Sequence, residues 1–123
     1  MRIILDTHLF LWALCDPGRI GETRRAEIET LSNTVYVSAI SIAEMMIKAS
    51  LGKLDVPFDP VAAAADSGFE ILAFEGEEAL RLRELPFHHR DPFDRMIIAQ
   101  GLARSYPIMT DDVKFHLYDC KLI

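Results

Sequence analysis

Residues 1–14 constrain the fold more than any other stretch, because they join a buried strand, an acidic turn and an apolar helix. Residues 1–5 (MRIIL) are apolar apart from Arg2 and lack helical periodicity, which is typical of a parallel strand buried on both faces. Asp6 and Thr7 end this strand, and residues 9–14 (LFLWAL) follow as an apolar helix. In α/β folds, ligands bind beyond the carboxyl ends of the strands, where Asp6 would lie.

The rest of the chain repeats this alternation of strand and helix. We therefore predict one domain over residues 1–123, an α/β/α sandwich around a central, mostly parallel sheet of four to five strands. In the charged helix expected at 77–85, Leu80, Leu82 and Leu85 would supply the packing. Further strands are expected at 35–37, 69–74 and 108–109, with an edge strand at 121–123. Further helices are expected at 21–31, 41–50, 61–66, 92–105 and 113–117.

The stretch 88–100 (HHRDPFDRMIIAQ) predicts a sharply defined helix start. Asp91 has the chemistry of an N-cap, and Pro92 would occupy the first helical position, where its missing N–H costs nothing. Asp94 then falls in the first turn, followed by isoleucines three and four residues later. The helix therefore carries a carboxylate at the head of a face that we expect to be buried.

Four acidic residues are expected at one edge of the sheet. Asp6 and Asp112 follow strands, whereas Glu44 and Asp94 lie in the first turns of helices. In a parallel sheet these positions share an edge, where gathered carboxylates repel one another and lose hydration unless a cation compensates. All four are oxygen donors, and the sequence has no His/Cys cluster with zinc spacing, so a hard divalent cation is expected.

Each of these acids also has a purely structural interpretation. Glu44 follows Ser41 by three residues, as in a capping box, and Asp94 could simply favour the helix dipole. Asp111 and Asp112 could cap the last helix, and either could provide the fourth carboxylate. Only the coincidence of all four positions favours a metal site. Three neighbouring hydroxyls could orient the acids or serve only in turns and caps: Thr7, Ser41 and Thr110.

Composition excludes some classes of protein. The formal net charge of −6 argues against a general nucleic-acid coat protein, although bound divalent cations would reverse the local charge at an acidic site. The apolar runs are short and broken by charge, so neither a membrane span nor a signal peptide is visible and a cytoplasmic location is expected. Cys15 and Cys120 lack metal or redox spacing and are expected to be buried free thiols.

The chain resembles the PIN domain, and most closely the VapC-like toxins of bacterial toxin–antitoxin pairs. The resemblance runs almost from end to end, through MRIILDTHLFLWAL, SAISIAEMMIK, LGKLDVP, HHRDPFDRMIIAQ and TDDVKF in the family's order and spacing. It implies a PIN-like fold, with Asp6, Glu44, Asp94 and Asp112 as the metal-binding and catalytic acids and Asp91 outside that set.

The resemblance further implies a metal-dependent endoribonuclease that uses Mg²⁺ or Mn²⁺, a cognate antitoxin and a homodimer. Asp6 and Asp94 would have the main metal-bridging roles, Glu44 would support them or transfer a proton, and Asp112 would serve a second metal or its water. Whether one ion or two operate stays open.

RNA would approach past basic groups near residues 88–95. The candidates are His88, His89, Arg90 and Arg95, with Lys48 and Lys53 as further ones. Arg95 has an alternative role as a surface ion pair with Asp91, four residues earlier. The two histidines do not have metal-pair spacing, and a solvated loop is the simpler account of them.

Two other functions stay open. The first is a non-catalytic PIN-like domain that binds RNA or a protein partner; intact acids at all four positions weigh against it. The second is a receiver-like phosphoacceptor, but Thr7 stands where an acidic pair would be needed. The apolar bulk of residues 9–14 and 45–47 exceeds what one helix face needs, although core packing is expected for most of it.

Overall fold

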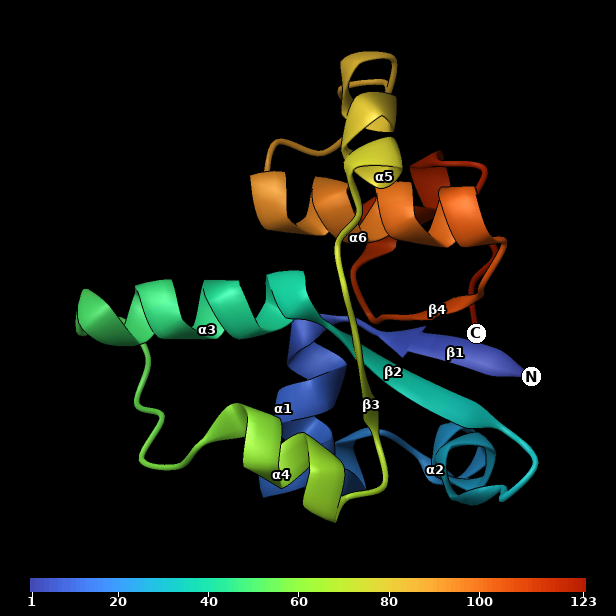
Figure 1. The fold of residues 1–123 in the computed structure, drawn as a ribbon. Coiled ribbons are helices and arrows are strands. Elements are labelled where there is room, and N and C mark those ends of the chain that lie inside the picture. Colours follow the sequence, from blue (N-terminus) through green and yellow to red (C-terminus); the bar gives the residue numbers. More distant parts are fainter.

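The computed structural model describes residues 1–123 as a parallel sheet between two layers of helices (Figure 1). Its four strands are β1 (Arg2–Leu5), β2 (Thr34–Ser38), β3 (Glu70–Leu72) and β4 (Ile108–Met109), in the order β3-β2-β1-β4. Every strand pairing is parallel, which confirms the predicted α/β sandwich. The possible fifth strand is reduced to a single bridge between Ile108 and Leu122.

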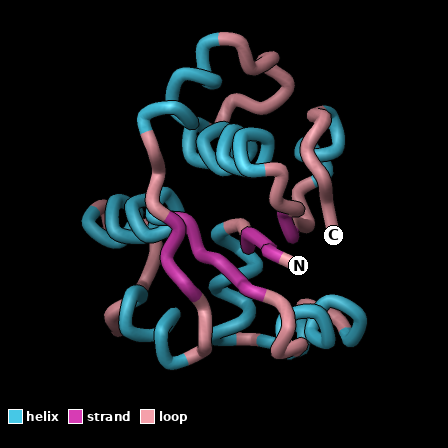
Figure 2. The backbone as a smooth tube through the Cα atoms, turned by 45° about the vertical axis from the view of Figure 1, so that its right-hand side comes forward, coloured by secondary structure: helices cyan, strands magenta, loops and turns pink.

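Helices cover both faces of the sheet. In Figure 1, α1, α2 and α4 lie below the strands, α5 and α6 lie above them, and α3 extends past the end of β2. Figure 2 shows the same separation of helices from the central strands after rotation. The helices are α1 (Thr7–Cys15), α2 (Glu22–Glu29), α3 (Ala39–Ser50), α4 (Pro60–Asp66), α5 (Gly76–Leu80) and α6 (Pro92–Arg104), with 3-10 turns η1 (Pro17–Arg19), η2 (Arg81–Arg83) and η3 (Val113–Leu117).

The sheet separates two hydrophobic cores. Ile3 and Leu5 of β1 face the core formed with α1, α3 and α4, whereas Ile4 faces the core formed with α6 and η3. All three side chains are fully buried, which explains why the first strand is apolar on both faces. Gly101 lets α6 approach β4 closely, because a Cβ at that position would lie 2.6 Å from Ile108 Cδ1.

Two details differ from the sequence predictions. The expected helix at 77–85 is a short α5 followed by the η2 turn, and this change of helical pitch leaves Leu80 72% exposed while Leu82 and Leu85 pack against the core. Cys15 and Cys120 are free, as predicted, but Cys15 is exposed because it ends α1 at the surface. None of the helices has the length and apolar character needed to cross a membrane.

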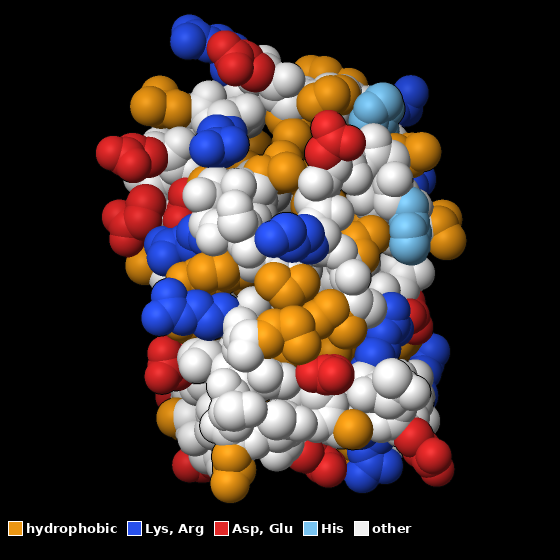
Figure 3. All heavy atoms as spheres, turned by 90° about the vertical axis from the view of Figure 1, so that its right-hand side faces the viewer, with side chains coloured by type: hydrophobic (Ala, Val, Ile, Leu, Met, Phe, Trp, Pro, Cys, Tyr) orange, Lys and Arg blue, Asp and Glu red, His pale blue; other side chains and the backbone are white.

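The two ends of the sheet differ in what surrounds them. The strands' carboxyl ends meet α3 and the first turn of α6, while both chain termini lie at the opposite end (Figure 1). Figure 3 looks onto the end with the termini and shows acidic, basic and hydrophobic side chains interspersed. The acids of interest are on the elements that converge at the carboxyl end.

Candidate metal centre

Asp6 connects the end of β1 to both α1 and the segment after β4. It is the N-cap of α1, where its Oδ1 accepts a hydrogen bond from the Leu9 N–H at 2.8 Å. The Thr110 hydroxyl donates to its other oxygen, Oδ2. The residue is only 3% exposed, so its carboxylate is buried and oriented from two sides.

Glu44 points inward from α3 and is 2% exposed. The Thr7 hydroxyl donates to its Oε1 at 2.7 Å, and the Lys48 ammonium lies 2.6 Å from its Oε2. The capping box predicted for Ser41 and Glu44 is wrong, because Ser38 caps the helix and places its start two residues earlier. Glu44 is thereby free of a capping role.

Asp91 and Asp94 have the separate positions that the sequence predicted. The Asp91 side chain caps α6 by accepting hydrogen bonds from the backbone N–H groups of Phe93 and Asp94. Asp94 lies one turn into the helix with its side chain only 17% exposed. The cap therefore presents Asp94 toward the carboxyl end of the sheet.

The side chains of Asp111 and Asp112 point in different directions. Asp112 caps η3 through a 2.9 Å hydrogen bond from the Lys114 N–H, and its Oδ2 faces Asp94 across His89. Asp111 points away and forms an ion pair with Arg24 of α2. Of these two acids, only Asp112 belongs to the cluster.

His89 is the member of the cluster that the sequence prediction missed. Its Nε2 lies 2.8 Å from Asp112 Oδ2 and 2.9 Å from Asp94 Oδ2, so one ring nitrogen joins the two acids. The expected solvated loop is wrong for this residue, which is 6% exposed, whereas its neighbour His88 is exposed. No local pattern marks His89, because its burial depends on Tyr118 and Phe115 from η3 and its end.

The electrostatics of the cluster are unfavourable without a cation. Burial raises the pKa of Asp94 to about 7, and the negative charges of Asp91, Glu44 and Asp6 add to this shift, while His89 opposes it. Burial also raises the pKa of Asp6, although its hydrogen bonds from Thr110 and Leu9 oppose the rise. The carboxylates are thus close enough to disfavour one another's charged forms.

Two of the acids, Asp112 and Glu44, have contacts that stabilise their negative charge. Burial acts to raise the pKa of Asp112, but the hydrogen bonds from the Lys114 N–H and His89 outweigh it and the pKa is lowered. The hydrogen bond to Glu44 raises the pKa of Lys48 and so favours its charged form. These contacts compensate two of the four acids and leave Asp6 and Asp94 to be compensated by another positive charge.

The donor set fits a hard divalent cation. Asp6, Glu44, Asp94 and Asp112 offer carboxylate oxygens from four different parts of the fold, and burial with neighbouring negative charge raises the pKa of Asp94. No buried side-chain nitrogen or oxygen lacks a hydrogen-bond partner. The buried polar side chains around the acids are therefore all hydrogen-bonded, and only the negative charge of the acids is left uncompensated.

The basic residues predicted to meet RNA divide into exposed and buried groups. Arg95 is 6% exposed and binds neither Asp91 nor solvent; its guanidinium donates to the Pro86 and Leu85 carbonyls at 2.7 and 3.1 Å. Both sequence interpretations of Arg95 are therefore wrong. His88, Arg90 and Lys53 are exposed, and Lys48 lies at the surface beside Glu44.

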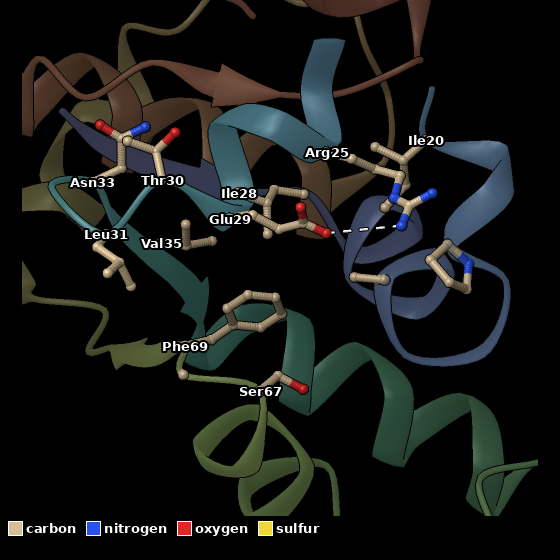
Figure 4. Close-up of a pocket in the computed structure, with 13 residues that line it drawn as sticks. Ile20, Arg25, Ile28, Glu29, Thr30, Leu31, Asn33, Val35, Ser67 and Phe69 are labelled. Carbon is tan, nitrogen blue, oxygen red and sulfur yellow. Dashed lines mark ion pairs between the residues drawn. The ribbon is translucent and has the colours of Figure 1, made fainter. Parts of the chain in front are cut away.

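Two cavities lie at opposite ends of the sheet. A cavity of about 210 Å³ adjoins Glu44 and is lined by Thr7, His8, Lys48 and Lys53 among others. A larger one of about 550 Å³ lies between α2, the start of β2 and the segment before β3 (Figure 4). Its close-up shows one ion pair, between Arg25 and Glu29, and no cluster of acids. The smaller cavity, and not the larger one, adjoins a member of the acidic cluster, Glu44.

The fold and the acidic cluster agree with a family comparison. Residues 3–120 match the PIN domain, and the chain belongs to this family. No curated protein sequence matches the chain significantly.

Solved structures with the same fold come from VapBC assemblies. VapBC2 from Rickettsia felis, bound to a promoter DNA fragment, has a TM-score of 0.76 at 19% identity and covers 100% of this chain and 98% of that chain. DNA-bound VapBC from Salmonella typhimurium has a TM-score of 0.72 at 18% identity, with 100% and 97% covered. VapBC-5 from Mycobacterium tuberculosis, of a toxin–antitoxin family, has a TM-score of 0.57 at 20% identity, with 99% and 95% covered. These likenesses establish a shared fold.

Proposed function

We propose that this chain, as a single PIN domain over residues 1–123, is a metal-dependent endoribonuclease toxin of the VapC type. The observation that carries the proposal is the convergence of Asp6, Glu44, Asp94 and Asp112 from four elements on one end of the sheet. Gathered carboxylates with perturbed pKa values, here the raised values of Asp6 and Asp94, are typical of a catalytic site, whereas structural acids are normally compensated within the protein. We assign all four as metal ligands and catalytic residues.

The reaction proposed is hydrolysis of an RNA phosphodiester bond. Bound Mg²⁺ or Mn²⁺ would activate water and neutralise charge on the phosphoryl oxygens. Asp6 and Asp94, which have raised pKa values, would be the principal ligands, and Asp112 would complete the site. Glu44 accepts a hydrogen bond from Thr7 and pairs with Lys48, so its carboxylate is oriented to support the site or to accept a proton.

RNA would reach the acids from the side of α3 and the 86–91 loop. Lys48 and Lys53 line the cavity next to Glu44, and His88 and Arg90 are exposed on the loop. The positive charges of Lys48, Lys53 and Arg90 would attract the phosphate backbone toward the acidic centre. His89 and Arg95 are buried and are left out of this proposed RNA surface.

We further propose a cognate antitoxin and a homodimer as protein partners. The structures with the same fold are VapBC and FitAB assemblies, and these support a two-component system. Met46, Ile47 and Leu51 are 39%, 46% and 62% exposed, so α3 and its end present apolar side chains that a partner could cover. Leu9, Phe10 and Met45 are fully buried, as expected for most of the apolar excess.

The decisive experiment compares wild type with Asp94→Asn on total RNA, with Mg²⁺, with Mn²⁺ and with a chelator. We expect the variant to fold and to lose at least about 100-fold in cleavage rate, because it lacks a ligand charge. Asp112→Asn should also lose activity, whereas Asp111→Asn is the matched control and should retain it, since Asp111 pairs with Arg24 outside the cluster. Undiminished cleavage by Asp94→Asn in chelator would falsify the proposal.

The alternative is a non-catalytic PIN-like domain that binds RNA or a protein. Calorimetry separates the two: divalent ions should bind wild type and not Asp94→Asn. RNA binding without any divalent-ion binding would favour the alternative.

A further inference from the structure

Phe87 is an exposed aromatic residue in the loop before α6. It is 80% exposed, whereas the other six of the seven phenylalanines are buried or half-buried. A phenyl ring in water forgoes the free energy that its burial would contribute to folding. Core packing therefore does not explain the position of this ring.

Arg95 holds the ring of Phe87 from one side. The central carbon of its guanidinium lies 3.9 Å from the ring centroid, over the ring face. The same guanidinium donates to the carbonyls of Pro86 and Leu85 at 2.7 and 3.1 Å, so it fixes the backbone that carries the ring as well as the ring itself. Since Phe87 is nevertheless mostly exposed, the opposite face of the ring is open to solvent.

A small cavity adjoins this ring. Its volume is about 190 Å³, below the roughly 300–1,000 Å³ of typical small-molecule sites, so it suits a single flat ring system. Leu82 and Met96 are half-buried in its wall, whereas Arg90 is exposed. The hollow thus combines an apolar lining with a cation at the surface. The lining contains two arginines and no acid: Leu82, Phe87, Arg90, Pro92, Arg95 and Met96.

The charges around the cavity favour a nucleobase over an apolar protein side chain as its occupant. Arg81 and Arg83 flank Leu82 in η2, and both are exposed, as is Arg90. A single nucleic-acid strand presents flat bases beside negative phosphates, and proteins bind it by stacking the bases on aromatic rings within positively charged grooves. An apolar side chain would fill the hollow without using any of these arginines.

We propose that Phe87, supported by Arg95, is a stacking platform for an unpaired base of the RNA, and that Arg90 binds an adjoining phosphate. The inference rests on the proposed function, because it assigns a further subsite for the same substrate. The platform is a binding site and takes no part in the chemical step.

The position of the platform on α6 places the bound base away from the scissile bond. Pro92 and Met96 are four residues apart and lie on one side of the helix, whereas Asp94, two residues from each, faces the other side. A helix with its side chains is about 10–12 Å across, and successive stacked nucleotides rise about 3.4 Å, so the base on Phe87 would be about three nucleotides from the cut.

The first test measures the affinity for a fluorescein-labelled, unstructured oligouridylate by fluorescence anisotropy, in chelator so that the RNA stays intact. Phe87→Leu keeps an apolar side chain but removes the ring, so the Kd should rise at least about fivefold. Phe87→Tyr keeps the ring and should stay within about twofold of wild type. Leu80→Ala is the control and should not change the Kd, because Leu80 is similarly exposed, at 72%, but lines none of the cavities described.

The second test separates stacking from attraction of the phosphates. Phe87→Leu should not change the affinity for an RNA duplex of the same length, because paired bases are already stacked inside the helix. Arg90→Met should weaken the binding of both RNAs and reduce the slope of log K against log salt concentration by about 1. The Kd for Mn²⁺, measured by the EPR signal of the free ion, should be unchanged in Phe87→Leu and shows that the variant is folded with its acids in place.

Three results would overturn the platform. They are equal oligouridylate affinity of wild type and Phe87→Leu, an equal loss of single-strand and duplex affinity in Phe87→Leu, and a loss of affinity in Phe87→Tyr as large as in Phe87→Leu. A wild-type chain that binds oligouridylate through Phe87 but cleaves no RNA with Mg²⁺ or Mn²⁺ would contradict the proposed nuclease function alone. Metal-dependent cleavage by wild type together with unchanged RNA affinity in Phe87→Leu would contradict the platform alone.

Discussion

The two ends of the sheet contrast in cavity size and in charge. The amino end has the larger cavity, about 550 Å³, and its one ion pair, Arg25 with Glu29, is exposed and spans 3.7 Å. The carboxyl end has a cavity of about 210 Å³, but four acids converge there, of which Asp6 and Glu44 are buried and Asp94 and Asp112 are partly buried. The comparison teaches that the largest hollow and the convergent, poorly compensated acids lie at different ends, so cavity size alone would not have pointed to the proposed site.

The difference arises from the direction of the strands. Each β-strand of a parallel sheet delivers the residue after it to the same edge, so Asp6 and the segment with Asp112 arrive together. Helices that begin at this edge carry the other two acids: Asp94 lies in the first turn of α6 as predicted, whereas Glu44 lies in the second turn of α3, because that helix starts earlier than expected. The amino end receives the turns that enter the strands, and Asn33 and Phe69 there line the cavity without creating a reactive cluster.

The largest effect we expect on stability is a pH dependence of the metal-free protein. The pKa of Asp94 is about 7 in the folded state, against an ordinary value of 3.8, so the folded state holds a proton that the unfolded chain has lost. Stability should therefore fall as pH rises from about 4 to 7, by up to about 4 kcal/mol. Asp6 acts in the same direction, whereas Asp112, whose pKa is lowered, acts oppositely at lower pH.

Thermal melts in chelator between pH 5 and pH 8 would measure this dependence. Mn²⁺ added at pH 8 should restore the lost stability, because the ion binds only the folded state. Asp94→Asn in chelator should be more stable than wild type at pH 8 and should respond little to Mn²⁺. If the stability of the wild type did not change between pH 5 and pH 8, the carboxyl end would not carry the unfavourable charge that distinguishes it from the amino end.

The next largest effect should come from Arg95→Met. The guanidinium lies 3.9 Å from the centroid of the Phe87 ring and donates to the carbonyls of Pro86 and Leu85. Its loss would leave the buried Leu85 carbonyl without this donor, while Pro86 would keep the hydrogen bond from Tyr118. We expect a loss of about 3 kcal/mol in the free energy of unfolding, measured by urea titration. Arg90→Met changes an exposed neighbour and should have little effect on stability.

A smaller effect is expected for Asp91→Ala. It removes the cap of α6 and should cost about 1 kcal/mol, whereas Asp91→Asn keeps a capping side chain and should cost less. Urea titration of the two variants measures the cap, and their Mn²⁺ affinities test whether Asp91 is also a ligand. A loss of binding in Asp91→Asn as severe as that in Asp94→Asn would place Asp91 in the metal site.

The contrast between Asp94 and Arg95 also shows what could be predicted from the sequence. The alternation of parallel strands with helices and the cap of α6 follow from periodicity and local capping chemistry, and these predictions agree with the structure. The burial of Arg95 and His89 depends on Tyr118, more than 20 residues away, which packs over an irregular loop. No periodic pattern encodes such a contact.

Local patterns also failed where two candidates competed. Ser38 and Ser41 both precede the apolar part of α3, and the cap formed at Ser38 because the strand ends there. Ser41 and Glu44 therefore have the spacing of a capping box but do not form one. Glu44 instead accepts a hydrogen bond from the Thr7 hydroxyl. The sequence could not distinguish the roles of Asp111 and Asp112, because Asp111 is drawn away by an ion pair with Arg24, which is distant in the sequence.

The smallest effect should come from Glu29→Gln at the larger cavity. The Arg25–Glu29 pair is exposed and one helical turn apart, so its loss should cost at most about 0.5 kcal/mol. Since the cavity lies at the opposite end of the sheet from Asp94, the Kd for Mn²⁺ and the rate of RNA cleavage should stay at wild-type values. Urea titration, EPR and the cleavage assay together measure these three quantities. A clear loss of cleavage in this variant, with unchanged Mn²⁺ affinity, would mean that the amino end also contacts the RNA.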